Sequence, residues 1–137
     1  MNEKTIVIHE IPKGQRRPKI ARHGKFNTLF DPDKEQNLWI KHLIQMDFYP
    51  HEPIEEPIEV DIVFYMPIAM STSKKRQKLM ALNEIKHTKK PDIDNIIKKY
   101  FDAMNGIVYK DDRQIWHVSA TKKYSTNPRT EIKLKWE

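Results

Sequence analysis

The sequence contains no cysteine. Disulfide bonds and thiolate zinc sites are therefore excluded, and a reducing compartment such as the cytoplasm is the expected location. Only three glycines occur in 137 residues, and neither a Gly-rich phosphate loop nor a G-x-S-x-G motif is present, so Walker-type nucleotide binding and serine hydrolysis are not supported. No apolar run approaches the about 20 residues that span a bilayer, and the N-terminal apolar stretch is too short for a signal peptide. We therefore expect a cytoplasmic protein without a membrane partner.

Positive charge is what the chain has in excess. The formal net charge is +6 and the isoelectric point is near 9.4, which favours an anionic partner such as nucleic acid. A length of 137 residues suits a single domain, 1–137, with one modest core. Lysine and arginine gather in four clusters, at 13–25, 74–78, 86–90 and 98–99.

Hydrophobic periodicity and turn residues predict a mixture of strands and helices. The β-branched run 4–11 is expected to be a strand, and the alternation of apolar and polar residues from Ile58 to Met66 indicates a half-buried strand. The basic segment 12–27 shows no period and is expected to be a loop or an extended arm, either solvated or in contact with phosphate. The remaining predicted elements are helices at about 31–46, 71–85 and 95–105 and strands at about 114–124 and 130–136.

Acidic residues are concentrated in one part of this basic chain. Five of its nine aspartates lie within the 21 residues from Asp92 to Asp112. Carboxylates gathered in this way repel one another unless a cation lies between them. Mg²⁺ is bound by a few carboxylate oxygens and keeps other positions for water and phosphate. The cluster therefore leads to the hypothesis of a metal held against a polyanion, and so of phosphodiester chemistry on nucleic acid.

Asp92 and Asp94 precede the predicted helix 95–105. Pro91 disfavours helical geometry at the residue before it, so we expect Asp92 at a strand end or turn and Asp94 at the lip of the helix. The positive end of the helix favours a carboxylate there, and both side chains can converge on one ion. The alternative for this pair alone is a helix cap beside a solvated acid.

Asp111 and Asp112 follow the helix after Gly106, which stands where a left-handed helix terminus is expected. A turn at this point could bring one of the two acids back to the mouth of the helix. Neighbours in a strand-like segment point to opposite faces, so only one of them can reach the same ion. Solvated loop acids are the alternative, but the combination of two acids, a helix of three turns and two further acids favours the metal hypothesis.

Lys98 lies four residues after Asp94 and therefore on the same face of the helix, one turn later. It is predicted either to form an ordinary ion pair or to stabilise the negative charge that develops on a phosphate during cleavage. Asp102, a further turn along, is expected to pair with Lys98 or hold it in position rather than to bind metal. Lys99 points elsewhere and is expected to contact solvent or a backbone.

Three motifs become recognisable together. They are K-P-D-I-D-N-I-I-K (90–98), F-D-A-M-N-G (101–106) and D-D-R-Q-I (111–115). In this order they resemble the RusA family of Holliday junction resolvases, which are endodeoxyribonucleases associated with phages and prophages. The family pattern is a basic residue, an optional proline, Asp-x-Asp-Asn, a lysine four residues after the second aspartate, then Phe/Leu-Asp-Ala-Leu, and later Asp-Asp-x-Gln. Met104 in place of the usual leucine and Lys110 before the acid pair are modest departures.

The resemblance implies a small homodimeric α+β protein, with a mixed β-sheet packed with helices, that binds four-way DNA junctions. It also implies paired symmetric nicks in two opposed strands, in DNA recombination or repair, with Mg²⁺ or Mn²⁺ as the cofactor. By motif, the metal-binding carboxylates are Asp92, Asp94 and Asp112, and the catalytic lysine is Lys98. Two alternatives stay open: a non-catalytic phage DNA-binding protein on the same scaffold, and a nuclease that prefers flaps or forks.

Overall fold

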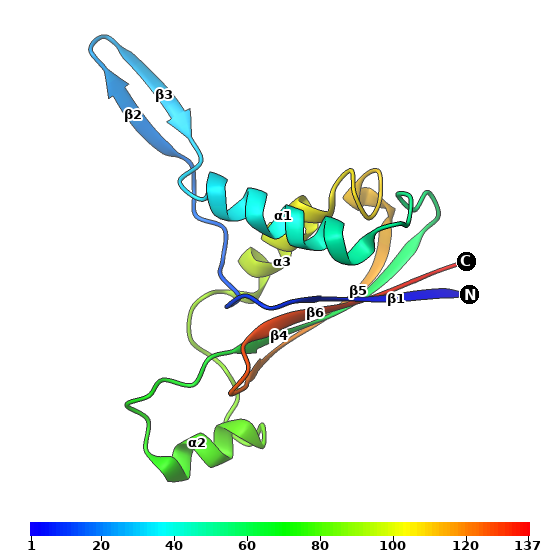
Figure 1. Cartoon of the computed structure of the whole chain (residues 1–137). Helices are drawn as coiled ribbons and strands as arrows, with labels where there is room; N and C mark the ends of the chain where they lie inside the picture. Colours follow the sequence, from blue (N-terminus) through cyan, green and yellow to red (C-terminus); the bar gives the residue numbers. More distant parts are fainter.

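The computed structural model describes every residue from Met1 to Glu137. The chain forms an α+β fold, as predicted, around a mixed sheet of four strands (Figure 1). None of its helices has the length and apolar character that crossing a membrane requires. The sheet contains, in order across it, β1 (Asn2–Ile8), β6 (Arg129–Trp136), β4 (Ile58–Met66) and β5 (Ile115–Tyr124).

Strand β4 lies inside the sheet, with β6 antiparallel on one side and β5 parallel on the other. Every second residue of β4 is buried and the residues between them are half-buried, because successive side chains of a strand point to opposite faces. The alternation read from the sequence at Ile58–Met66 is therefore confirmed to the residue. Strand β5 forms the outer edge, and much of it is exposed.

Two helices, α1 (Lys34–Phe48) and α3 (Ile93–Met104), lie against each other over one face of the sheet (Figure 1). Each presents a stripe of apolar residues spaced four apart, the spacing that keeps side chains on one face of a helix. Burying each of these side chains contributes about 1.5–3 kcal/mol. The two stripes consist of Ile40, Ile44 and Phe48 in α1 and of Ile96, Tyr100 and Met104 in α3.

A third helix, α2 (Lys74–Ala81), lies apart from the other two at one end of the molecule (Figure 1). It is shorter than the predicted helix 71–85. Ser73 caps its start, because its side chain accepts a hydrogen bond from the Arg76 N–H, and two residues after its end Asn83 turns into the left-handed region with φ 59°. Asparagine tolerates that conformation better than most residues, so the helix stops there.

The basic segment 12–27 leads into a pair of strands that the sequence did not reveal. Strands β2 (Lys19–His23) and β3 (Phe26–Phe30) form a separate antiparallel hairpin that projects from the body of the protein (Figure 1). We call residues 19–30 the arm. Gly24, with φ 62°, forms the turn between the strands, a conformation open to glycine without strain. Of the two expectations, a loop or an extended arm, the structure shows the arm, but its pairing into two strands was not predicted, because both faces are exposed and no burial pattern marks the strands.

Candidate active site

The two acids of the D-x-D pair lie at the start of α3, as predicted. Asp92 is the residue before the helix, in an extended conformation, and Asp94 lies in its first turn. Both are exposed, and the Asp94 carboxylate accepts a hydrogen bond from the Asn95 N–H at 2.9 Å. The partial positive charge at this end of a helix stabilises a carboxylate, so two anionic groups can be held here without a buried partner.

Asp94, Lys98 and Asp102 follow one another at successive turns on one face of α3. The expected pairing of Lys98 with Asp102 is confirmed, with 4.0 Å between the Lys98 Nζ and an Asp102 carboxylate oxygen. The two side chains are 68% and 52% exposed, and an exposed ion pair contributes at most about 1 kcal/mol. The amine of Lys98 therefore remains available to an incoming anion.

A short loop after α3 carries the second pair of acids. The side chain of Asp111 accepts a hydrogen bond from the Arg113 N–H at 2.9 Å and caps the single 3₁₀ turn η1 (Asp112–Gln114). Asp111 is thus committed to holding the loop, whereas Asp112 is half-buried and makes no hydrogen bond to a backbone N–H. The two acids therefore differ in their backbone contacts: Asp111 caps the turn, and Asp112 does not.

Gln114 fixes this loop to the rest of the protein. Its Oε1 accepts hydrogen bonds from the N–H groups of Lys110 and Asp111, both at 3.0 Å. Its Nε2 donates to the carbonyl oxygens of Ile54 at 2.8 Å and Glu56 at 3.1 Å, almost 60 residues earlier in the chain. One amide group therefore ties the acid pair to the segment that leads into β4.

Asp112 lies in the electrostatic field of the α3 face. Burial raises the pKa of Asp112, the carboxylates of Asp111 and Asp102 raise it further, and the ammonium group of Lys98 works in the opposite direction. These are the effects expected when carboxylates crowd together near one amine. The turn η1 that carries Asp112 is in contact with α3, so the fold brings Asp112 near the helix that carries Lys98 and Asp102, which the sequence spacing alone left open.

The acids do not form a ready-made metal cluster. No group of three or more His, Asp or Glu side chains is arranged so that it could hold an ion. A helix rises about 1.5 Å per residue, so the backbones of Asp94 and Asp102 are roughly 12 Å apart along α3, with Lys98 about midway. The candidate ligands are nevertheless of the type that a hard divalent cation binds, because all of them are carboxylates. Asp92 and Asp94 at the start of α3 are exposed, so their side chains have room to reorient around an ion.

The prediction that Lys99 contacts solvent or a backbone was wrong. Lys99 is 2% exposed, and its Nζ donates to the side chain of Gln36 and lies 3.9 Å from an Asp33 oxygen. Asp33 also accepts from Nε of Arg16 at 2.7 Å and from the Arg16 N–H at 3.0 Å. Burial lowers the pKa of Lys99, and the charge of Asp33 opposes this. The signal in the sequence was its place three residues after Ile96, beside the apolar stripe of α3.

A pocket of about 440 Å³ opens between α1, α3 and the segments that lead into and out of the arm. It is strongly basic, with few apolar residues in its wall, and Lys98 and Asp102 lie on its α3 side. Such a lining suits the negatively charged backbone of a nucleic acid better than an apolar ligand. Its positively charged residues are Arg16, Lys34, Lys41, Lys98 and Lys99.

Comparison with known proteins identifies relatives over nearly the full length of the chain. The family model described as endodeoxyribonuclease RusA matches residues 11–135. An uncharacterised protein of Bacillus subtilis (strain 168), YqaN, is 34% identical over 136 residues, which cover 95% of this chain and 94% of that protein. The matched range includes the arm, α3 and the loop of Asp112.

Proposed function

Because the chain belongs to the RusA family of endodeoxyribonucleases, we propose that it resolves Holliday junctions in DNA recombination or repair by paired, divalent-metal-dependent nicks. The observation that carries this proposal is the contact of the turn η1, which begins at Asp112, with α3, the helix that carries the Lys98–Asp102 ion pair. A protein that only binds DNA gains nothing from carboxylates on a surface that faces phosphate. The family match across nearly all of 1–137 also supports treating the chain as one domain.

In this proposal Asp92, Asp94 and Asp112 hold Mg²⁺, or Mn²⁺ in its place. When bound, a divalent ion supplies Lewis acidity toward the scissile phosphate and lowers the pKa of a bound water. Lys98, whose amine is exposed and paired only with the exposed Asp102, stabilises the negative charge that develops on the phosphate. Asp102 restrains Lys98, and Gln114 keeps Asp112 at this face of α3.

The basic pocket and the net charge of +6 provide the attraction for DNA. Contacts between lysine or arginine and phosphate release counterions, so the affinity should fall steeply as salt is added. Two opposed cuts require two active sites related by a twofold axis, and we propose that a homodimer supplies them. Each copy contributes one set of Asp92, Asp94, Asp112 and Lys98.

The test is cleavage of a synthetic four-way junction with Mg²⁺, compared with a linear duplex, a flap, a fork and a single strand of the same sequence. We expect the junction to be cut roughly 10-fold or more faster than the duplex, with nicks at symmetric positions in two opposed strands and no cutting after chelation of the metal. Faster cleavage of the flap or fork would favour the alternative nuclease. Tight junction binding without turnover under any divalent metal would favour the non-catalytic DNA-binding protein.

Replacing Gln114 by alanine removes the amide that ties the acid loop to the segment before β4. Asp112 then loses its fixed position, so we expect junction cleavage to slow roughly 10- to 100-fold. The lost hydrogen bonds should also lower the free energy of unfolding by about 2 kcal/mol. Single-turnover cleavage and urea unfolding measure the two effects.

Gln77→Ala is a matched control, because Gln77 in α2 donates a hydrogen bond to Thr72 far from the acids. This variant should cut at the parent rate. If Gln114→Ala were destabilised but cut as fast as Gln77→Ala, the position of Asp112 would not depend on Gln114.

A further inference from the structure

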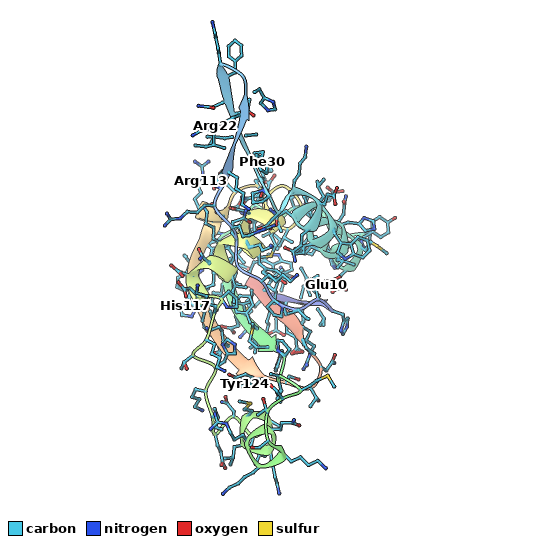
Figure 2. All side chains as sticks on the ribbon, turned by 90° about the vertical axis from the view of Figure 1, so that its left-hand side faces the viewer. Glu10, Arg22, Phe30, Arg113, His117 and Tyr124 are labelled. Atoms are coloured by element: carbon cyan, nitrogen blue, oxygen red, sulfur yellow. The ribbon has the colours of Figure 1, made fainter.

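Several large apolar side chains of the arm are exposed, and no other part of the protein covers them. Phe26 is 75% exposed, Leu29 73% and Ile20 63%. Isolated two-stranded hairpins are at best marginally stable in water, and these side chains pack against neither the sheet nor the helices. Figure 2 shows the side chains of the arm spreading from the ribbon beyond the body of the molecule, with Arg22 among them. A surface of this kind is typical of a binding element.

The charge of the arm indicates what it binds. No acidic residue occurs from Ile11 to Phe30, whereas arginine and lysine recur throughout that stretch. A second copy of the arm would therefore repel the first, and a polyanion would attract it. The positively charged side chains on the arm and next to its base are Arg17, Lys19, Arg22 and Lys25.

The two faces of the arm differ in character. The antiparallel register places His23 opposite Phe26 and Lys19 opposite Phe30 on one face, so basic and aromatic side chains are interleaved there. The other face pairs Ile20 with Leu29. Phe26 follows directly after the turn at Gly24, so an aromatic ring lies at the tip of a basic ribbon.

The base of the arm is held firmly. Arg16 on the incoming side bonds to the carboxylate of Asp33 and donates to the Pro32 carbonyl at 3.1 Å. Asp31 on the outgoing side accepts a hydrogen bond from Asn37 of α1 at 3.0 Å. Both ends of the arm are thus fixed to the first turns of α1. An exposed element on a fixed base can present its side chains in one direction without being ordered first.

The base of the arm also adjoins the candidate active site. A Cβ placed at Gly14 would lie 3.1 Å from the Pro91 side chain and 3.3 Å from that of Asn95, so the incoming segment passes close over the start of α3. Arg16 and Asp31 share the wall of the basic pocket with Lys98. A DNA strand whose phosphate lies against Lys98 therefore also lies beside the base of the arm.

We propose that the arm grips the branch point of the DNA, with its basic side chains on phosphates and Phe26 stacked on bases exposed there. This inference rests on the proposed function and deepens it, because it names the element that recognises branched DNA. A two-stranded ribbon fits a DNA groove, and apolar side chains of groove-binding proteins insert between bases and unstack them. At a branch point such bases are already less constrained than in a continuous duplex.

The experiment uses the full-length protein and a four-way junction with 2-aminopurine at the branch point, in chelator so that no strand is cut. The parent protein should change the 2-aminopurine fluorescence on binding. Phe26→Ala should lose this change and bind the junction about 10-fold more weakly, because one stacked base is lost. Its affinity for a linear duplex should stay within about twofold of the parent value.

Met70→Ala is the matched control, because Met70 is also a highly exposed apolar residue, in the loop before α2. It should behave as the parent does. Arg22→Gln should weaken binding to junction and duplex alike and reduce the salt dependence by about one phosphate contact. Phe26 makes no contact with the core, so thermal unfolding of Phe26→Ala should match that of the parent.

The outcomes separate the two proposals. If the parent neither binds nor cuts junctions, the proposed function fails. If the parent binds junctions and Phe26→Ala keeps the parent affinity and fluorescence change, the inference about the arm is overturned. Light scattering tests whether the arm binds a second copy of this chain instead of DNA. If the parent is a dimer and Phe26→Ala is a monomer, the arm binds the second copy, and the inference is overturned.

Discussion

Asp94→Asn is expected to slow junction cleavage by roughly 10²- to 10³-fold. Asparagine keeps the shape of the side chain but removes the negative charge with which Asp94 would hold a divalent ion. Asp94 is exposed in the first turn of α3 and makes one local hydrogen bond. The free energy of unfolding should therefore change by less than about 0.5 kcal/mol. The rate is measured under single-turnover conditions with Mg²⁺ and a four-way junction.

Two further aspartate substitutions test whether the loss of activity is specific to the proposed metal ligands. Asp61→Asn changes a half-buried aspartate on the open face of the sheet and should leave the rate unchanged. Asp102→Asn removes the partner of Lys98 and should slow cleavage less than about 10-fold, because Asp102 is proposed to restrain the lysine rather than to bind the metal. If Asp102→Asn were as inactive as Asp94→Asn, the set of metal-binding carboxylates would be wrongly assigned.

Asp33→Ala is expected to lower the free energy of unfolding by about 3 kcal/mol. Asp33 accepts two hydrogen bonds from Arg16 and faces the buried ammonium group of Lys99. Lys99 is 2% exposed in the parent protein. Removing the carboxylate leaves its ammonium group with the neutral side chain of Gln36 as its remaining hydrogen-bond partner. An uncompensated buried charge is strongly destabilising. Urea unfolding at neutral pH measures the change.

A double-mutant cycle isolates the interaction between Asp33 and Lys99. Lys99→Met replaces the buried amine by an apolar side chain of similar length, so Asp33→Ala should destabilise that background about 2 kcal/mol less than it destabilises the parent. Asp61→Ala is the control and should change the stability by less than about 0.5 kcal/mol. If Asp33→Ala were no more destabilising than Asp61→Ala, the buried pair would not hold this corner of the fold together.

The pKa of Asp33 bears on the acid stability of the same corner. Burial raises this pKa, but the hydrogen bonds from Arg16 and the charge of Lys99 outweigh burial and hold it below the ordinary value of 3.8. A carboxyl group with a lowered pKa in the folded state stabilises the protein above its ordinary pKa. That contribution is lost as the pH falls below 3.8 and through the lowered value.

Several elements were predictable because their signals are local. The alternation at Ile58–Met66 gave β4, and the apolar stripe of Ile96, Tyr100 and Met104 gave α3. Asp92 before the helix and Asp94 in its first turn follow from Pro91 and from the preference of carboxylates for helix starts. The pairing of Lys98 with Asp102 follows from helical spacing alone.

The two strands of the arm and the burial of Lys99 were missed for opposite reasons. The arm has exposed side chains on both faces, so no alternation of apolar and polar residues marks its strands. Lys99 lies beside the apolar stripe of α3, but a lysine is almost never fully buried unless it is paired. Its partner Asp33 is 66 positions earlier in the chain, at the start of α1, and only the packing of α1 against α3 brings the two together.

The sequence by itself determined that acidic residues begin α3, that Lys98 follows one turn later, and that Ile58–Met66 forms the inner strand β4. The tertiary structure decided that the turn η1 with Asp112 lies against α3, that Lys99 is buried, and that the base of the arm lies beside the basic pocket. The physical reason is the separation along the chain of the residues that interact. Helical and strand periodicity depends on residues a few positions apart, whereas the acid loop is held by hydrogen bonds from Gln114 to carbonyl groups almost 60 residues away.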